Sequence, residues 1–124
     1  MILVVDDEAP VRATISRALA ELGYPVREAE TGEQALTLIR EAPPQLVILD
    51  YVMPGMDGAE VARQIGDLHA NLPIVFSTGH GPLRALRESA GAEASVLEKP
   101  FTLAELDALI ARTLGAAPRL RNGG

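Results

Sequence analysis

Short apolar runs alternate along the chain with longer stretches in which apolar residues recur every three or four positions. In chain order the runs are Ile2–Val5, Val26–Ala29, Leu46–Leu49, Pro73–Ser77 and Ser95–Leu97. Runs of this length, bounded by turn residues, predict five β-strands. The most continuous ones, such as Leu46–Leu49, predict strands that are buried on both faces.

The stretches between these runs carry the signals of amphipathic helices. Apolar residues at positions 11, 15, 18, 19 and 22 share one helical face, and Gly23 favours the end of that helix. Thr31 with Gln34, and Thr102 with Glu105, have the spacing of capping boxes, which begin helices. Five helices are predicted, over about residues 11–22, 32–42, 57–68, 82–89 and 103–114.

Five strands alternating with five helices predict an α/β fold with a doubly wound, five-stranded parallel sheet covered by helices on both faces. The length of 124 residues fits one domain of this kind. We expect the domain to span residues 1–115, where the last predicted helix ends. Residues 116–124 contain Pro, Arg and two terminal glycines and are expected to form a flexible tail.

Composition narrows the possible functions. The formal net charge of -6 argues against direct nucleic-acid binding, which requires clustered Lys and Arg. The chain has no cysteine, so disulfides and thiolate metal sites are excluded. No apolar run approaches the ~18 residues that span a membrane, and no basic leader precedes the first apolar run. We therefore expect neither membrane insertion nor a signal peptide, and a cytoplasmic location.

Four of the five predicted strands end in residues with useful chemistry. Asp6 and Asp7 follow the first strand, Asp50 the third, Thr78 ends the fourth and Lys99 follows the fifth. The carboxyl ends of parallel strands lie on one edge of the sheet, where such sheets bind ligands. Three carboxylates, a hydroxyl and an ammonium are therefore expected to share one shallow pocket.

This combination fits the binding of Mg²⁺ together with a phosphoryl group. Carboxylates that lie close together repel one another, and a hard divalent cation removes that repulsion. An exposed carboxylate can attack phosphorus and form an acyl phosphate. Mg²⁺, Lys99 and Thr78 can each hold one of the phosphoryl oxygens on which charge develops.

Each of these residues also has an ordinary structural interpretation. An aspartate after a strand is commonly a turn former or helix cap, and a lysine such as Lys99 is commonly a solvated surface charge. Thr78, before Gly79, fits a turn. The joint occurrence of these residues at successive strand ends favours a common site. Asp57 is different, because its place before a predicted helix favours an N-cap over a second acceptor.

The site residues lie in four motifs that together resemble the receiver domain of two-component response regulators. The motifs are Ile2-Leu3-Val4-Val5-Asp6-Asp7-Glu8, Leu49-Asp50-Tyr51-Val52-Met53-Pro54-Gly55-Met56-Asp57-Gly58, Phe76-Ser77-Thr78-Gly79 and Leu97-Glu98-Lys99-Pro100-Phe101. The resemblance covers about residues 1–115. It implies a flavodoxin-like (βα)5 fold with strand order 2-1-3-4-5, as in chemotaxis-regulator-like stand-alone receivers or the receivers of hybrid histidine kinases.

The resemblance also implies a metal site. Asp7 is expected to bind Mg²⁺ directly and Asp6 mainly through water. Asp50 is expected to contribute a further ligand, and so is the backbone carbonyl of Val52.

The catalytic roles implied by the resemblance fall on Asp50, Thr78 and Lys99. Asp50 is expected to accept the phosphoryl group, Lys99 to pair with it, and Thr78 to bond one of its oxygens and to move on phosphorylation. The Lys99–Pro100 peptide bond is often cis in this family.

The implied function is phospho-accepting signal transduction. A histidine kinase or a histidine phosphotransfer protein would donate the phosphoryl group, and a downstream protein would read the change. Such a domain catalyses only its own phosphorylation and dephosphorylation.

Two departures from the family pattern keep other functions open. Val96 stands where many receivers carry Tyr or Phe, and the stretch between Gly81 and Lys99 is shorter than usual. An interaction module that works without phosphorylation is therefore one alternative. A Mg²⁺-dependent phosphatase is another, although Val52 stands where that chemistry commonly keeps an acid. His80 either modulates the access of water to the acyl phosphate or is an exposed loop residue.

Overall fold

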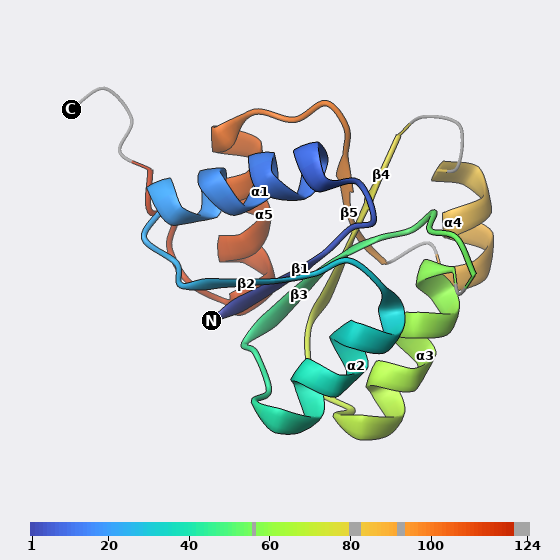
Figure 1. Cartoon of the computed structure of the whole chain (residues 1–124). Helices are drawn as coiled ribbons and strands as arrows, with labels where there is room; N and C mark the ends of the chain where they lie inside the picture. The colour runs from blue at the N-terminus through green and yellow to red at the C-terminus, as the bar shows by residue number, and fades with distance from the viewer. Residues whose placement is uncertain (56, 80–82, 92–93, 121–124) are drawn as a thin grey trace.

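Strands and helices alternate throughout the computed structural model, which describes residues 1–55, 57–79, 83–91 and 94–120 (Figure 1). The strands are β1 (Ile2–Val5), β2 (Val26–Ala29), β3 (Leu46–Asp50), β4 (Ile74–Thr78) and β5 (Ser95–Glu98). The helices are α1 (Ala9–Glu21), α2 (Gly32–Glu41), α3 (Gly58–Leu68), α4 (Leu83–Ala90) and α5 (Leu103–Leu114). The elements predicted from the hydrophobic pattern are thus present in the predicted order.

The five strands form one parallel sheet in the order β2-β1-β3-β4-β5. The chain first adds β2 on one side of β1 and then continues on the other side with β3, β4 and β5. The switch point of the topology therefore lies between β1 and β3, where ligands bind in open α/β sheets. The predicted fold class and strand order are confirmed.

Helices cover both faces of the sheet (Figure 1). Because side chains alternate along a strand, Ile2 and Val4 pack with α1 and α5, whereas Leu3 and Val5 pack with α2 and α3. We call these two sides the α1/α5 face and the α2/α3 face. The two apolar clusters hold the strands in place, and with them the residues at the carboxyl edge.

Three of the helices begin at side-chain caps that the sequence predicts. The hydroxyls of Thr31 and Thr102 and the carboxylate of Asp57 each accept a backbone N–H three residues later. The capping box at Thr102 is complete. At Thr31 it is not, because the side chain of Gln34 accepts the backbone N–H of Glu30 instead. The prediction of a complete capping box at Thr31 is therefore wrong.

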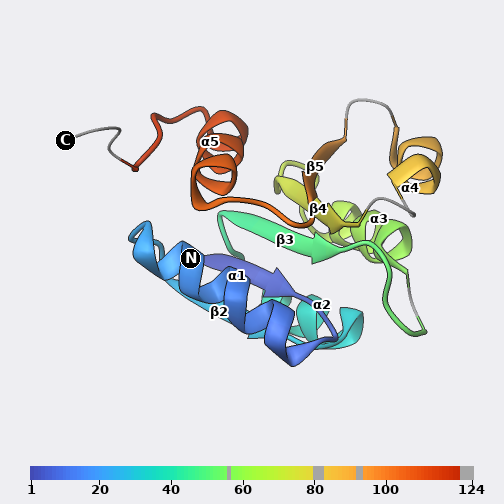
Figure 2. The ribbon, with the colours of Figure 1, turned by 90° about the horizontal axis from the view of Figure 1, so that it is seen from above.

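Helix α4 lies beside α3 and apart from α5 (Figures 1 and 2). Its bounds agree with the predicted short helix, although Pro82, where that helix was expected to begin, lies outside the described residues. Val96 is partly buried and packs against the apolar cluster of the α2/α3 face. The Lys99–Pro100 peptide bond is cis.

Residues 116–120, which belong to the predicted flexible tail, pack against the body of the domain. The buried carboxylate of Asp107 accepts the backbone N–H groups of Arg119 and Leu120 at 2.8 and 2.6 Å. The Arg119 guanidinium lies 3.7 Å from the centre of the Tyr24 ring and donates to the carbonyl of Gly23 at 3.3 Å. Residues 121–124 lie outside the described part of the chain.

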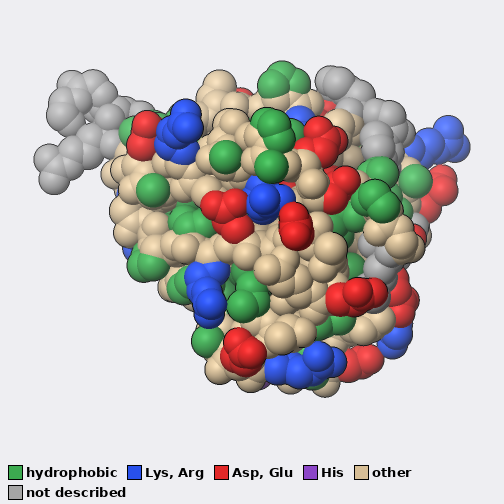
Figure 3. All heavy atoms as spheres, in the orientation of Figure 1, with side chains coloured by type: hydrophobic (Ala, Val, Ile, Leu, Met, Phe, Trp, Pro, Cys, Tyr) green, Lys and Arg blue, Asp and Glu red, His purple; other side chains and the backbone are tan. Residues whose placement is uncertain are grey.

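On the face drawn in Figure 3, basic side chains are scattered among acidic ones. This distribution differs from the basic stripe of a nucleic-acid-binding surface. Among the described residues, no helix is both long enough and apolar enough to cross a membrane.

The contacts of Asp107 predict the first testable effect. Asp107→Ala removes two hydrogen bonds to a carboxylate and should lower the free energy of unfolding by about 2 kcal/mol. Asp107→Asn keeps one acceptor oxygen, so its free energy of unfolding should lie between those of the wild type and Asp107→Ala. Urea unfolding of the three proteins measures the difference. If the alanine variant unfolds at the same urea concentration as the wild type, residues 116–120 do not stabilise the domain.

Candidate functional site

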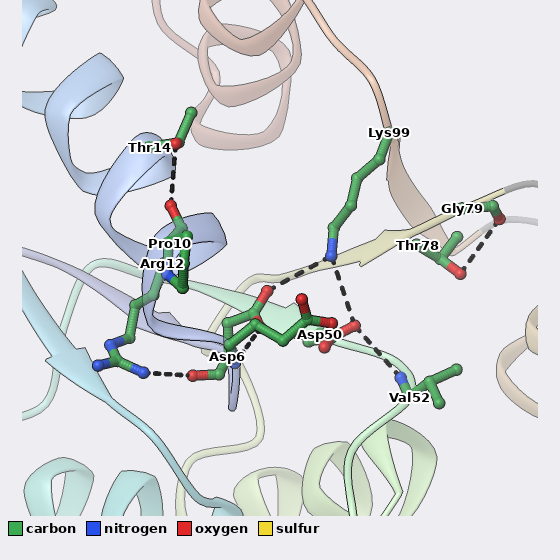
Figure 4. Close-up of polar contacts among 10 residues, drawn as sticks. Asp6, Pro10, Arg12, Thr14, Asp50, Val52, Thr78, Gly79 and Lys99 are labelled. Carbon is green, nitrogen blue, oxygen red and sulfur yellow. Dashed lines mark hydrogen bonds and ion pairs between the residues drawn. The ribbon is translucent and has the colours of Figure 1, made fainter.

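The three acidic residues predicted for the site gather at the carboxyl edge of the sheet, where Figure 4 shows Asp6 and Asp50 side by side. Asp6 and Asp7 follow β1, and Asp50 is the last residue of β3. One oxygen from each of the three carboxylates lies within 4.8 Å of the others. Asp6 and Asp50 are buried, whereas Asp7 is exposed, so the cluster opens to solvent on one side.

Lys99 reaches this cluster from the far side of β4. Its ammonium lies 3.4 Å from Oδ2 of Asp6 and 3.8 Å from Oδ1 of Asp50 (Figure 4). The backbone N–H of Lys99 donates to the carbonyl of Thr78 at 2.7 Å, which fixes the start of the side chain. The ammonium therefore lies between two buried carboxylates, nearer to Asp6 than to Asp50.

The electrostatics of Asp50 are unusual for an aspartate. Burial raises the pKa of the Asp50 carboxyl group to about 7, and the negative charge of Asp6 adds to the rise. The Lys99 ammonium and the backbone N–H of Val52 lower the same pKa, but their effect is smaller than that of burial. An added cation would favour the ionised, nucleophilic form of Asp50.

Asp6 is held by the segment that follows it. Its Oδ1 accepts the backbone N–H of Glu8 at 2.9 Å, and its carbonyl accepts a hydrogen bond from the Arg12 guanidinium at 2.8 Å. Arg12 also pairs with Glu28 on β2 at 2.8 Å. Sequence reasoning missed Arg12. The sequence offered one signal for Arg12, namely its position in the first turns of the helix that follows an acidic pair.

The loop after Asp50 is fixed by close backbone packing. The backbone N–H of Val52 donates to Oδ1 of Asp50 at 3.3 Å, and that of Gly58 donates to the carbonyl of Tyr51 at 2.8 Å. A Cβ atom at position 58 would lie 2.6 Å from the Cα of Tyr51. Only glycine fits there. Asp57 caps α3, as predicted, rather than joining the acidic cluster.

Thr78 lies at the same edge, but its hydroxyl is not directed at the cluster. Thr78 is buried, and its Oγ1 donates to the carbonyl of Gly79 at 3.3 Å rather than turning toward Asp50 (Figure 4). The preceding residue, Ser77, was not among the predicted site residues. It is 1% exposed, and its hydroxyl has no hydrogen-bond partner among the described residues.

The structure thus brings four of the predicted residues into one cluster: Asp6, Asp7, Asp50 and Lys99. Val52 touches Asp50 through its N–H, and Thr78 lies alongside. His80 lies outside the described residues. The roles assigned to the individual residues stay predictions.

The donor set fits a magnesium ion. Mg²⁺ prefers hard oxygen ligands, and one or two carboxylates suffice because the ion keeps several waters. The three clustered carboxylates meet this requirement and leave the exposed side at Asp7 for water or phosphate oxygens. A divalent charge would also relieve the repulsion that burial at this edge intensifies.

Comparison with known proteins agrees with this geometry. Residues 2–111 match the sequence profile of the response regulator receiver domain. Response regulator MprA of Mycolicibacterium vanbaalenii is 43% identical over 107 residues, covering 85% of this chain and 46% of that protein. The phosphate regulon transcriptional regulatory protein PhoB of Pseudomonas aeruginosa is 38% identical, covering 90% of this chain and 52% of that protein. The chain spans about half the length of these curated relatives.

Solved structures show the same fold. The receiver domain of NtrX from Brucella abortus has a TM-score of 0.87 and 32% identity, over 94% of this chain and 100% of that one. The chemotaxis protein CheY4 of Vibrio cholerae has a TM-score of 0.79 and 30% identity, over 91% and 97% of the two chains. The chain therefore belongs to the response regulator receiver domain family of two-component signal transduction.

Proposed function

We propose that Asp50 accepts a phosphoryl group in a Mg²⁺-dependent reaction. The observation that carries this proposal is the position of its carboxylate. Asp50 ends a central strand beside Asp6 and Asp7, with the Lys99 ammonium 3.8 Å from its Oδ1. In this position a cation already lies beside the carboxylate and can stabilise the negative charge of the incoming phosphoryl oxygens.

The reaction is a phosphoryl transfer between a phosphohistidine and a carboxylate. A carboxylate oxygen of Asp50 attacks phosphorus, the bond from phosphorus to the histidine nitrogen breaks, and the imidazole leaves and regains a proton. The product is an acyl phosphate on Asp50. Bound to the acidic cluster, Mg²⁺ would neutralise charge on the phosphoryl oxygens.

Two side chains assist in this proposal. Lys99 pairs with a phosphoryl oxygen, which requires only a small displacement from its place near Asp50. Thr78 turns its hydroxyl from the carbonyl of Gly79 to another phosphoryl oxygen. That turn changes the end of β4, and the surface beside it would report phosphorylation to a partner.

Receiver domains interact with histidine kinases and with downstream effectors. For this chain we propose a histidine kinase or a histidine phosphotransfer protein as donor and a protein as downstream partner. The net charge of -6 and the mixed charges on the face drawn in Figure 3 support a protein partner rather than direct contact with nucleic acid. The chain would catalyse only its own phosphorylation and dephosphorylation.

The first experiment measures mass after incubation with acetyl phosphate and Mg²⁺. The wild type should gain one phosphoryl group, and Asp50→Asn should gain none, because an amide is not a nucleophile of this kind. Removing Mg²⁺ with a chelator should abolish the gain in the wild type.

Asp57→Asn is the matched control for that experiment. It makes the same change in the same loop but keeps an effective helix cap, so labelling should equal that of the wild type. The proposal fails if the wild type takes no label, or if Asp50→Asn is labelled equally well. If neither Asp50→Asn nor beryllofluoride changes the affinity for a partner, the result would favour an interaction module that works without phosphorylation.

A second prediction concerns the pH dependence of stability without Mg²⁺. The pKa of Asp50 is about 7 in the folded protein against an ordinary 3.8, so the folded protein holds a proton that the unfolded chain releases. The stability due to this proton is complete below pH 3.8 and is lost as the pH rises through 7. The free energy of unfolding should fall by up to about 1.4 kcal/mol per pH unit in this window.

Urea unfolding between pH 4 and pH 8 in the presence of a chelator measures this effect. Asp50→Asn lacks the titrating group and isolates its contribution, so the difference between variant and wild type should grow as the pH rises. Saturating Mg²⁺ should reduce that difference, because the cation replaces the proton in relieving repulsion. Parallel pH profiles for the two proteins would contradict the prediction.

A further inference from the structure

Ser77 is a buried hydroxyl beside the acceptor that the proposed reaction leaves unused. Ser77 is the backbone partner of Asp50 in the pairing of β3 with β4. Paired residues of parallel strands direct their side chains to the same face. Val75, two residues before Ser77, and Ile48, two residues before Asp50, both pack on the α1/α5 face. Ser77 and Asp50 therefore lie next to each other on that face.

The side chain of Lys99 reaches from the end of β5 to the acceptor Asp50. Lys99 follows β5, whereas its ammonium contacts carboxylates at the ends of β1 and β3. Since β4 lies between β5 and β3, the Lys99 side chain spans the width of β4 to reach these carboxylates. Ser77 on β4 is paired with Asp50, so its hydroxyl lies beside the carboxylate that the Lys99 ammonium approaches.

The resting structure leaves this hydroxyl unsatisfied. Ser77 is 1% exposed, and no described residue forms a hydrogen bond with its Oγ. A buried polar group without a partner costs free energy, so a state in which it gains a partner is favoured. Asp50, the partner of Ser77 in the sheet, lies on this face, and the Lys99 ammonium lies 3.8 Å from Oδ1 of Asp50.

Loading of the site changes the partners of Lys99. In the resting structure its ammonium is nearest to Asp6, at 3.4 Å. When Asp6 serves a metal ion and Asp50 carries a phosphoryl group, that contact with Asp6 is weakened. An ammonium has three donors, of which the phosphoryl group would take one or two.

We propose that Ser77 is a positioning residue, whose hydroxyl accepts a hydrogen bond from the Lys99 ammonium in the loaded site and holds it against the phosphoryl group. This inference rests on the proposed function of Asp50. Ser77 would act through Lys99 and would stabilise the loaded state more than the resting one. A group that assists a reaction has to make this difference between the two states.

The test measures the affinity of the protein for beryllofluoride in saturating Mg²⁺, by titration calorimetry, together with urea unfolding of the unloaded protein. Ser77→Ala should weaken beryllofluoride binding on the order of tenfold, the effect of one hydrogen bond to a charged group. Its stability should equal or exceed that of the wild type, because the lost hydroxyl had no partner. Ser77→Thr, which keeps the hydroxyl, should bind more tightly than Ser77→Ala.

Two comparisons separate this role from a merely structural one. Ser16→Ala removes another buried hydroxyl without a partner, on α1, and should leave beryllofluoride affinity unchanged. In a Lys99→Met background, Ser77→Ala should have no further effect, because the hydroxyl acts through the ammonium. If Ser77→Ala is too unstable to measure, Ser77→Cys, of similar size but a weak acceptor, replaces it and should lose affinity likewise.

Several outcomes overturn the inference. Equal affinities of wild type and Ser77→Ala would do so, and so would a loss of affinity that persists in the Lys99→Met background. A fall in stability with unchanged affinity would show a packing role only. If the wild type neither binds beryllofluoride nor takes label on Asp50, the proposed function itself fails, and the inference with it.

Discussion

The repulsion among Asp6, Asp7 and Asp50 is the constraint on which the rest of the site depends. The pairing of β1 with β3 brings Asp6, which follows β1, close to Asp50, the last residue of β3, at the edge of a buried sheet. The Lys99 ammonium and the backbone N–H groups of Glu8 and Val52 offset part of their charge, and a bound cation would offset more. Burial is the main cause of the raised pKa of Asp50, and the negative charges of Asp6 and Asp7 add to it. The Lys99 ammonium lies beside Asp6 and Asp50 and offsets part of their charge. Under the proposed function, metal binding and activation of the Asp50 nucleophile would therefore be coupled.

The backbone around Asp50 determines how a change there reaches the surface. Gly58 packs directly against Tyr51, with no room for a side chain, and the two residues share a hydrogen bond of 2.8 Å. Asp57, the neighbour of Gly58, caps α3. A displacement of the loop after Asp50 must therefore displace the start of α3 as well. Val96, by contrast, is one of the partly buried residues that pack on the α2/α3 face.

The sequence is sufficient to predict the order of elements, the sheet and the gathering of charged residues at its edge, because these follow from local periodicity and from the rule for parallel strands. Features that depend on distant partners were not predictable. The place of Ser77 beside Asp50 follows from the pairing of β3 with β4, and the contacts of Arg119 and Leu120 depend on Asp107 and Tyr24. Gln34 shows the same limit locally, since a capping-box spacing does not decide which N–H the side chain accepts.

Under the proposed function, resting and phosphorylated states differ in a few named contacts. Lys99 lies nearer to Asp6 than to Asp50, and Thr78 donates to Gly79. Both contacts have to be exchanged for contacts with the phosphoryl group, whereas Ser77 has none to give up. Each exchange trades one hydrogen bond for another, so the free-energy difference between the two states is small compared with either set of contacts. A single phosphoryl group can shift such an equilibrium, because its bonds to Lys99 and Thr78 exist in only one of the two states.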